Sequence, residues 1–277
     1  MILVTGASGK TGRAVLAALQ AEGAPTRALA RSEQPLPADE VLQGDMADSA
    51  VMAAALAGAQ AVYFIAPNMH PTEAALGADW IAAAKAAGVR RFIYHSVLFP
   101  QIEIMPHHWQ KLRVEEALIQ SGLEFTILQP ASYMQNILPY IASMHEHGEY
   151  RVPYSVDAKF SPVDLEDVAT AAARVLQQPG HIGAINQLAG PDVLSSTEMA
   201  QYAAQHLGRQ VTAVQQPLAD WQAANAHLPT YTRGTLAAMF TYYDVYGFAA
   251  SSFALAHLLE REPTHFADFL AREVDAG

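Results

Sequence analysis

Short apolar runs alternate with alanine-rich stretches along the first half of the chain. The runs have the length of buried strands, and the stretches between them have the composition and length of helices. The predicted helices begin near Lys10, Asp48, Thr72, His108 and Ser132. The predicted strands are Ile2–Thr5, Thr26–Ala30, Val41–Gln43, Ala61–Ile65, Arg91–His95 and Glu124–Leu128. This alternation indicates an α/β fold, a doubly wound parallel sheet with helices on both faces.

The ends of these helices carry their own signals. Asp48 and Thr72 belong to the residue types that cap helix N-termini with a side-chain oxygen. Glycines, which often terminate helices, follow the helical stretches. They are Gly23, Gly58, Gly88 and Gly122.

The alternation becomes irregular after about Tyr150, and residues 218–247 are rich in aromatic side chains. We predict a main domain over residues 1–150, with residues 158–190 returning to it, and a smaller mixed α/β C-terminal lobe over residues 191–277. Strand-like pieces in this half are Lys159–Val163, Ala184–Leu188 and Val211–Gln215. Helices are expected near Asp164, Ser196, Leu218 and Thr264–Arg272.

A glycine pattern follows the first predicted strand and leads into a helical stretch. The first glycine permits a tight turn, the second lets backbone approach a phosphate, and the third lets the helix pack against the strand. The N–H groups at the helix start suit a pyrophosphate, although a glycine-rich turn without a ligand is the alternative. The residues expected at the phosphates are Gly6, Ser8, Gly9, Lys10, Thr11 and Gly12. The spacing Thr5-Gly6-x-x-Gly9-x-x-Gly12 resembles that of extended and atypical short-chain dehydrogenase/reductases, which implies a nicotinamide cofactor and not FAD.

Arg31 follows the second predicted strand, where an NAD site carries an acidic residue for the ribose 2′-hydroxyl. A guanidinium pairs instead with a 2′-phosphate, and Lys10 could reach the same group. The two cations favour NADPH over NADH. The alternative is that both are ordinary surface residues.

The next two strand ends offer further cofactor contacts. Asp45 could accept a hydrogen bond from the adenine amino group, with Met46 against the ring, or it could form the entry turn of the following helix. Both interpretations stay open. The small residues Ala66, Pro67 and Asn68 are expected to run along the nicotinamide ribose.

Ser96 follows the fifth predicted strand, in the position of the serine that many short-chain reductases use on a substrate carbonyl. Most of those enzymes place a tyrosine four residues before a lysine on one helical face. Here His107 replaces the tyrosine and Lys111 is kept. Lys111 is expected to bind the nicotinamide ribose. His107 could donate a proton or a hydrogen bond as a neutral imidazole, or His107 and His108 could be cap or packing residues.

After the sixth strand, Pro130 and Ala131 are expected to pack on the nicotinamide face. The phenol of Tyr133 could lie close to a substrate, or the ring could be a core aromatic anchored by one hydrogen bond.

These residues together resemble the NmrA-like branch of atypical short-chain dehydrogenase/reductases, over about the first 180 residues. The resemblance implies a Rossmann-type fold with NADP(H) bound at the positions just described. It further implies either a reductase of quinones, dyes or other conjugated acceptors, or a redox sensor that binds the dinucleotide and a protein partner. The missing tyrosine puts alcohol dehydrogenation by a Tyr/Lys proton relay in doubt. The segments that carry the resemblance are Thr5–Gly12, Pro106–Lys111, Ser121–Asn136 and Val163–Ala169.

The amino-acid composition argues against several classes of partner and site. The formal net charge is -11 and the basic residues form no cluster, which argues against direct contact with nucleic acid or an anionic membrane. Without cysteine the chain has no disulfide and no thiolate ligand, and no metal is expected. No apolar run has the length of a membrane span, and Met1 leads straight into the first strand, so a cytoplasmic location is expected.

The sequence therefore predicts an NADPH-dependent reductase that transfers hydride to a planar, conjugated, largely apolar acceptor such as a quinone. Lys111, His107 and Tyr133 are the candidate catalytic residues. A homodimer is the oligomeric state that we consider for this chain. The alternative function is an NADP(H)-binding regulator that acts through a protein partner without turnover, and a third is an isomerase or lyase on the same scaffold.

Overall fold

The computed structural model describes residues 1–32 and 34–274. The chain forms two compact units. The first comprises Met1–Glu103, His107–Gln129 and Val168–Asn186, and the second comprises Ile104–Pro106, Pro130–Asp167 and Gln187–Gly277. Residues 275–277 of the predicted C-terminal lobe lie outside the described residues.

The first unit is built around a seven-stranded sheet with the strand order β3-β2-β1-β4-β5-β6-β8. The neighbouring strands from β3 to β6 are all parallel. The winding reverses between β1 and β4, which is where open α/β sheets bind ligands. The strands are β1 (Ile2–Val4), β2 (Thr26–Ala30), β3 (Glu40–Gln43), β4 (Ala61–Phe64), β5 (Arg91–His95), β6 (Glu124–Pro130) and β8 (Ala184–Leu188).

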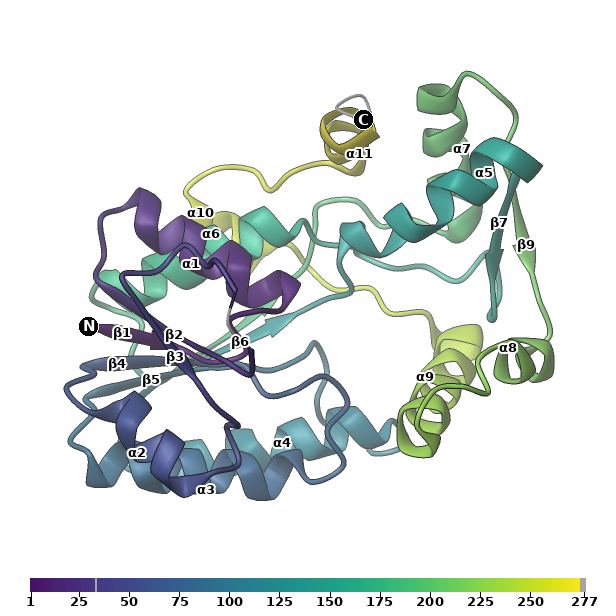
Figure 1. Ribbon diagram of the computed structural model, residues 1–277. Helices are drawn as coiled ribbons and strands as arrows, with labels where there is room; N and C mark the ends of the chain where they lie inside the picture. Colours follow the sequence, from purple (N-terminus) through teal and green to yellow (C-terminus); the bar gives the residue numbers. More distant parts are fainter. Residues whose placement is uncertain (33, 275–277) are drawn as a thin grey trace. The chain divides into compact units, whose positions relative to one another are not determined.

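Helices cover both faces of this sheet, with α2, α3 and α4 on one face and α1 and α6 on the other (Figure 1). The predicted Rossmann-type, doubly wound fold is therefore confirmed. The helices are α1 (Lys10–Ala21), α2 (Ser49–Leu56), α3 (Glu73–Ala86), α4 (Pro106–Gln120) and α6 (Leu165–Gln177).

Of the two predicted N-cap residues, Asp48 caps its helix and Thr72 does not. The Asp48 carboxylate accepts hydrogen bonds from the backbone N–H groups of Ala50 at 2.8 Å and Val51 at 3.4 Å, so it caps α2 as expected. Thr72 stands at the N-cap position of α3, but within the described part of the chain its side chain makes no capping bond. Its hydroxyl instead lies 3.4 Å from Nδ1 of His70.

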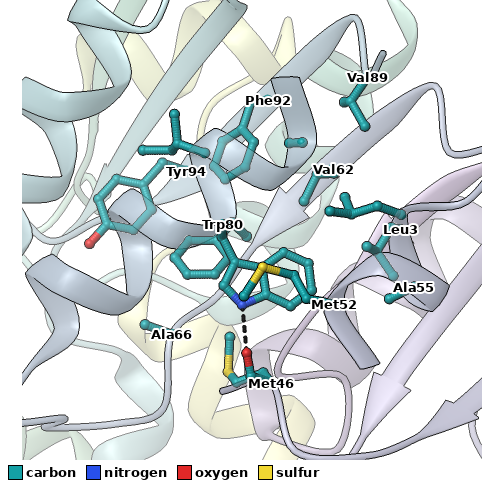
Figure 2. Packing of buried hydrophobic residues seen from close by; sticks show 14 of the residues in the cluster. Leu3, Met46, Met52, Ala55, Val62, Ala66, Trp80, Val89, Phe92 and Tyr94 are labelled. Atoms are coloured by element: carbon teal, nitrogen blue, oxygen red, sulfur yellow. Dashed lines mark hydrogen bonds between the residues drawn. The ribbon is translucent and has the colours of Figure 1, made fainter. Parts of the chain in front are cut away.

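Trp80, on α3, lies at the centre of the hydrophobic core between the sheet and the helices α2, α3 and α4 (Figure 2). The indole is fully buried, and its Nε1 donates a hydrogen bond to the backbone oxygen of Met46 at 2.9 Å. The Phe64 ring lies between Trp80 and Phe92, with centroid distances of 5.8 and 5.6 Å. The indole bond satisfies a buried donor and joins α3 to the segment that follows β3.

The second unit contains both helices and strands. Its strands β7 (Glu149–Val152) and β9 (Thr212–Gln215) pair in parallel. Its helical segments are the 3-10 helix η1 (Met134–Tyr140), α5 (Ile141–His147), α7 (Ser196–Leu207), α8 (Leu218–Ala224), α9 (Thr230–Tyr246), α10 (Phe253–Leu259) and α11 (Phe266–Val274). The predicted lobe over residues 191–277 stays a prediction.

Some local expectations in this half were wrong. Residues 159–163 do not form the expected β-strand. Phe160 instead makes isolated β-bridges with Leu194 and Phe248. The helix expected from Ser132 begins as a 3-10 helix, whose interior includes Pro139, a residue without the N–H that an α-helical turn needs. Strand β7 and the aromatic helix α9 were not predicted as elements. Across residues 1–32 and 34–274, none of the helices has the length and apolar character needed to cross a membrane.

Candidate functional site

Thr5 joins the ends of β1 and β4 at the point where the winding of the sheet reverses. Its hydroxyl donates to the Ile65 carbonyl at 3.0 Å and accepts from the Ile65 N–H at 2.8 Å. The side chain is fully buried. This pair of bonds holds the glycine turn beside the segment that begins at Ala66. This contact was not predicted from the sequence, because its two residues are 60 positions apart.

The glycine turn has a geometry that larger residues would disrupt. Gly6 adopts a positive φ of 58°, and a Cβ there would lie 3.1 Å from atoms of Ile65. The N–H of Gly9 donates to the Gly6 carbonyl at 3.0 Å and closes the turn. A Cβ on Gly12 would lie 2.4 Å from the same carbonyl oxygen, so α1 approaches the turn as closely as only glycine permits.

The start of α1 is open to an anion. Gly9 is the N-cap and provides no side-chain cap, and the first turn contains no acidic residue within the described part of the chain. Ser8, Gly9 and Lys10 are exposed. Helix-start N–H groups without a capping side chain, at the positive end of the helix dipole, match a phosphate. The residues of this cradle therefore fit the pyrophosphate of a dinucleotide.

Arg13 connects this turn with the segment after β2, a contact that the sequence did not reveal. Its guanidinium donates to the Ser8 carbonyl at 3.3 Å, to the Pro35 carbonyl at 3.2 Å and, in a short contact, to Oε1 of Gln34. Arg31 lies just after β2 in the same connection, and it is exposed like Lys10. Arg13 thus orders the backbone beside the two cations that were predicted at the 2′-phosphate.

Asp45 and Met46 have structural roles in the turn before α2. The Asp45 carboxylate accepts from the Ala47 N–H at 2.9 Å, which is the helix-entry interpretation of this residue. The Met46 side chain is 8% exposed and belongs to the core around Trp80. Their contact with adenine stays a prediction.

A buried polar cluster lies where α3, β5 and α4 meet. Glu73 is fully buried, and its Oε1 accepts hydrogen bonds from Lys111 Nζ and from the Tyr94 hydroxyl, each at 2.8 Å. Lys111 also donates to the His95 carbonyl at 3.2 Å. The lysine therefore lies at the carboxyl end of β5, and it is held there by a carboxylate that sequence reasoning did not identify.

His107 lies one helical turn before Lys111 and is also buried. Its Nδ1 is 3.7 Å from Oε2 of Glu73. Burial lowers the pKa of His107 to about 2, and the charges of Lys111 and His108 add to the effect. The nearby carboxylate does not reverse this direction, because its charge is already paired with Lys111 at 2.8 Å. The imidazole is neutral at physiological pH.

Ser96 makes its main contact within the protein. Its hydroxyl donates to Oε1 of Glu115 in a short contact, and Gln129 Nε2 donates to both carboxylate oxygens at 3.0 Å. Burial raises the pKa of Glu115, against the opposing effects of these hydrogen bonds and of Lys111. Donation from Ser96 to a substrate carbonyl would require the hydroxyl to give up its hydrogen bond to Glu115.

The remaining predicted residues occupy two different places. Ala66, Pro67 and Asn68 lie shortly after β4, beyond Ile65, and Asn68 is exposed. Pro130 ends β6, and Ala131 donates its N–H to the Leu188 carbonyl at 2.9 Å. Tyr133 is partly exposed and precedes η1. Pro130, Ala131 and Tyr133 belong to the second unit, whereas Ala66–Asn68, Ser96, His107 and Lys111 belong to the first.

Comparison with known proteins gives a consistent picture. The NmrA-like family matches residues 1–270. An NAD(P)H azoreductase of Xenophilus azovorans is 31% identical over 221 residues, which cover 77% of this chain and 76% of that protein. Quinone oxidoreductase 2 of Escherichia coli is 30% identical over 231 residues, which cover 81% and 80%. A crystal structure of the NADPH-dependent quinone oxidoreductase QOR2 from Escherichia coli, complexed with NADPH, has a TM-score of 0.86 at 28% identity and covers 98% of this chain and 99% of that chain.

Proposed function

Because the chain belongs to the NmrA-like family, we propose that it is an NADPH-dependent reductase of planar conjugated acceptors, with quinones as the substrate class. The observation that carries the proposal is the uncapped start of α1 behind the glycine turn, at the reversal point between β1 and β4. Two relatives of 30% identity or more are named as an NAD(P)H azoreductase and a quinone oxidoreductase, which supports this reaction class.

NADPH, when bound, supplies the hydride that reduces the acceptor. The glycine turn and the start of α1 would hold its pyrophosphate, and Arg31 with Lys10 would hold the 2′-phosphate. We assign the adenine to Asp45 and Met46. Within the first unit, the nicotinamide half is assigned to Ala66–Asn68, Ser96 and Lys111.

The buried cluster would position the nicotinamide ribose and leave protonation to solvent. Lys111 is anchored on Glu73 and the His95 carbonyl, so its ammonium has a defined position from which to donate to ribose hydroxyls. A quinone that has accepted hydride becomes a stabilised anion, which water can protonate without a strong general acid. The cytoplasmic location and the homodimer stay predictions.

The experiment that tests the function is a turnover assay with a panel of acceptors. NADPH oxidation should depend on an added quinone and should saturate with its concentration. Tight NADPH binding without turnover on quinones, triarylmethane dyes or enones would contradict the reductase. A change in affinity for a protein partner between NADPH and NADP would then identify a sensor.

Replacement of Arg31 tests the choice of cofactor. A charge-assisted hydrogen bond contributes about 1.5–3 kcal/mol, so Arg31→Ala should weaken NADPH binding by about 10-fold or more and leave NADH binding nearly unchanged. Calorimetry with both cofactors measures the two affinities. Arg90→Ala is the matched control, because Arg90 is an exposed arginine just before β5, at the opposite end of the strands. Equal losses for NADPH and NADH would contradict the assignment of Arg31 to the 2′-phosphate.

Removal of the candidate proton donors should have small effects. Loss of a true general acid costs about 10²–10⁴-fold, whereas His107→Ala and Tyr133→Phe should each reduce turnover by less than about 10-fold. Both variants are to be measured on one quinone at saturating NADPH. A loss of about a thousandfold with intact NADPH affinity would identify the altered residue as the acid.

A further inference from the structure

We propose that Glu73 is a positioning residue that holds His107 in the tautomer with its proton on Nδ1, so that Nε2 offers a hydrogen-bond acceptor to an N–H or O–H group of a bound ligand. The inference rests on the proposed function only for the presence of that ligand. The tautomer itself is a property of the free protein.

One carboxylate oxygen of Glu73 already accepts two hydrogen bonds. Oε1 accepts from Lys111 Nζ and from the Tyr94 hydroxyl, each at 2.8 Å. Burial, followed by the charge of Glu73, raises the pKa of Tyr94 well above its usual value, so this hydroxyl keeps its proton and acts as a donor. Partners on α4 and β5 therefore fix the orientation of a carboxylate that α3 supplies.

The other oxygen of Glu73, Oε2, lies opposite Nδ1 of His107. Within the part of the chain that the structure describes, neither Oε2 of Glu73 nor Nδ1 of His107 has a hydrogen-bond partner, and both atoms are buried. They face each other at 3.7 Å, which is longer than a full hydrogen bond. An N–H directed at the carboxylate is attracted to it, whereas a nitrogen lone pair is repelled. The proton of the neutral imidazole is therefore favoured on Nδ1.

The proton on Nδ1 determines whether Nε2 donates or accepts a hydrogen bond. A neutral ring carries one proton, so Nε2 has a bare lone pair when Nδ1 is protonated. A residue with this tautomer accepts a hydrogen bond at Nε2 and cannot donate one there. The structure thereby favours a different role for His107 from the proton donor considered from the sequence. A ribose hydroxyl, a carboxamide N–H and a hydroquinone hydroxyl are donors of the required kind.

The tautomer can be read directly by ¹⁵N NMR of histidine-labelled protein without ligand. The chain has 11 histidines, and the spectrum of His107→Gln identifies the resonances of His107 by their disappearance. We expect a protonated Nδ1 and an unprotonated Nε2. A protonated Nε2 in the unmodified protein would overturn the proposal without the need for any variant at Glu73.

Glu73→Gln gives a sharper test, because it should reverse the tautomer. Lys111 and Tyr94 both need an acceptor, so the amide oxygen of glutamine should take the place of Oε1. The amide NH₂ then faces Nδ1, which must become the acceptor, and the proton moves to Nε2. Tyr94→Phe is the matched control, since it keeps the carboxylate and should keep the proton on Nδ1. An unchanged tautomer in folded Glu73→Gln would contradict the role of Glu73.

The acceptor role is tested by adding NADP⁺ and then a hydroquinone, with binding checked by calorimetry on the same samples. A shift of the Nε2 resonance with either bound ligand is expected, and no shift with both bound would refute contact with a ligand donor. If neither compound binds, the proposed function fails, while the tautomer result on the free protein stands by itself.

Discussion

Gly9→Val should abolish NADPH binding and leave the fold intact. Gly9 has φ -74° and ψ 166°, a conformation open to any residue, and an added Cβ would come no closer than 3.3 Å to the Gly6 carbonyl oxygen. The branched side chain would instead fill the space at the start of α1. Loss of two charge-assisted hydrogen bonds to the pyrophosphate, at about 1.5–3 kcal/mol each, corresponds to at least about a 100-fold loss of affinity.

Calorimetry with NADPH and a thermal unfolding curve measure the two halves of this prediction. Gly234→Val is the matched control, because a Cβ on Gly234 in α9 would meet no atom of another element within 4 Å among residues 1–32 and 34–274. The control should unfold at a similar temperature and bind NADPH normally. If Gly9→Val also binds NADPH with unchanged affinity, the glycine turn is not the phosphate site.

Lys111→Ala should destabilise the protein by about 3–5 kcal/mol, because it leaves the buried Glu73 carboxylate without its cation. This loss of stability would by itself lower measured turnover. The double replacement Lys111→Met with Glu73→Gln removes both charges and keeps an acceptor for the Tyr94 hydroxyl. Replacement of a whole buried pair by uncharged groups is often close to neutral, so the double variant should recover most of the stability.

Urea denaturation of the single and double variants gives the two free energies of unfolding. Lys85→Ala serves as a control for the loss of a lysine, since Lys85 Nζ makes an exposed hydrogen bond to the Ser121 carbonyl at 2.6 Å. A Lys111→Ala protein as stable as the control would contradict the buried pair. Weak NADPH binding by the stable double variant would then report the separate role of Lys111 at the ribose.

The doubly wound unit could be predicted from local sequence patterns, and the same patterns indicate where the candidate cofactor site lies. Strand-length apolar runs, alanine-rich helical stretches and the glycine pattern after the first strand are local features that lie within a few residues of one another. They place the phosphate cradle at Gly6–Gly12. They also place Lys111 on a helix after the fifth strand, since side chains four residues apart share a helical face.

The contacts around those residues could not be predicted, because they join segments that are far apart in the chain. Glu73 and Lys111 are 38 residues apart in the chain, and Thr5 and Ile65 are 60 apart. No local period reports which buried carboxylate meets which cation, because the pairing depends on how α3, α4 and the sheet pack together. The second unit was predicted less well for the same reason. Its short strand Glu149–Val152 is specified by its pairing with Thr212–Gln215, which lies far along the chain, and not by the pattern of its own residues.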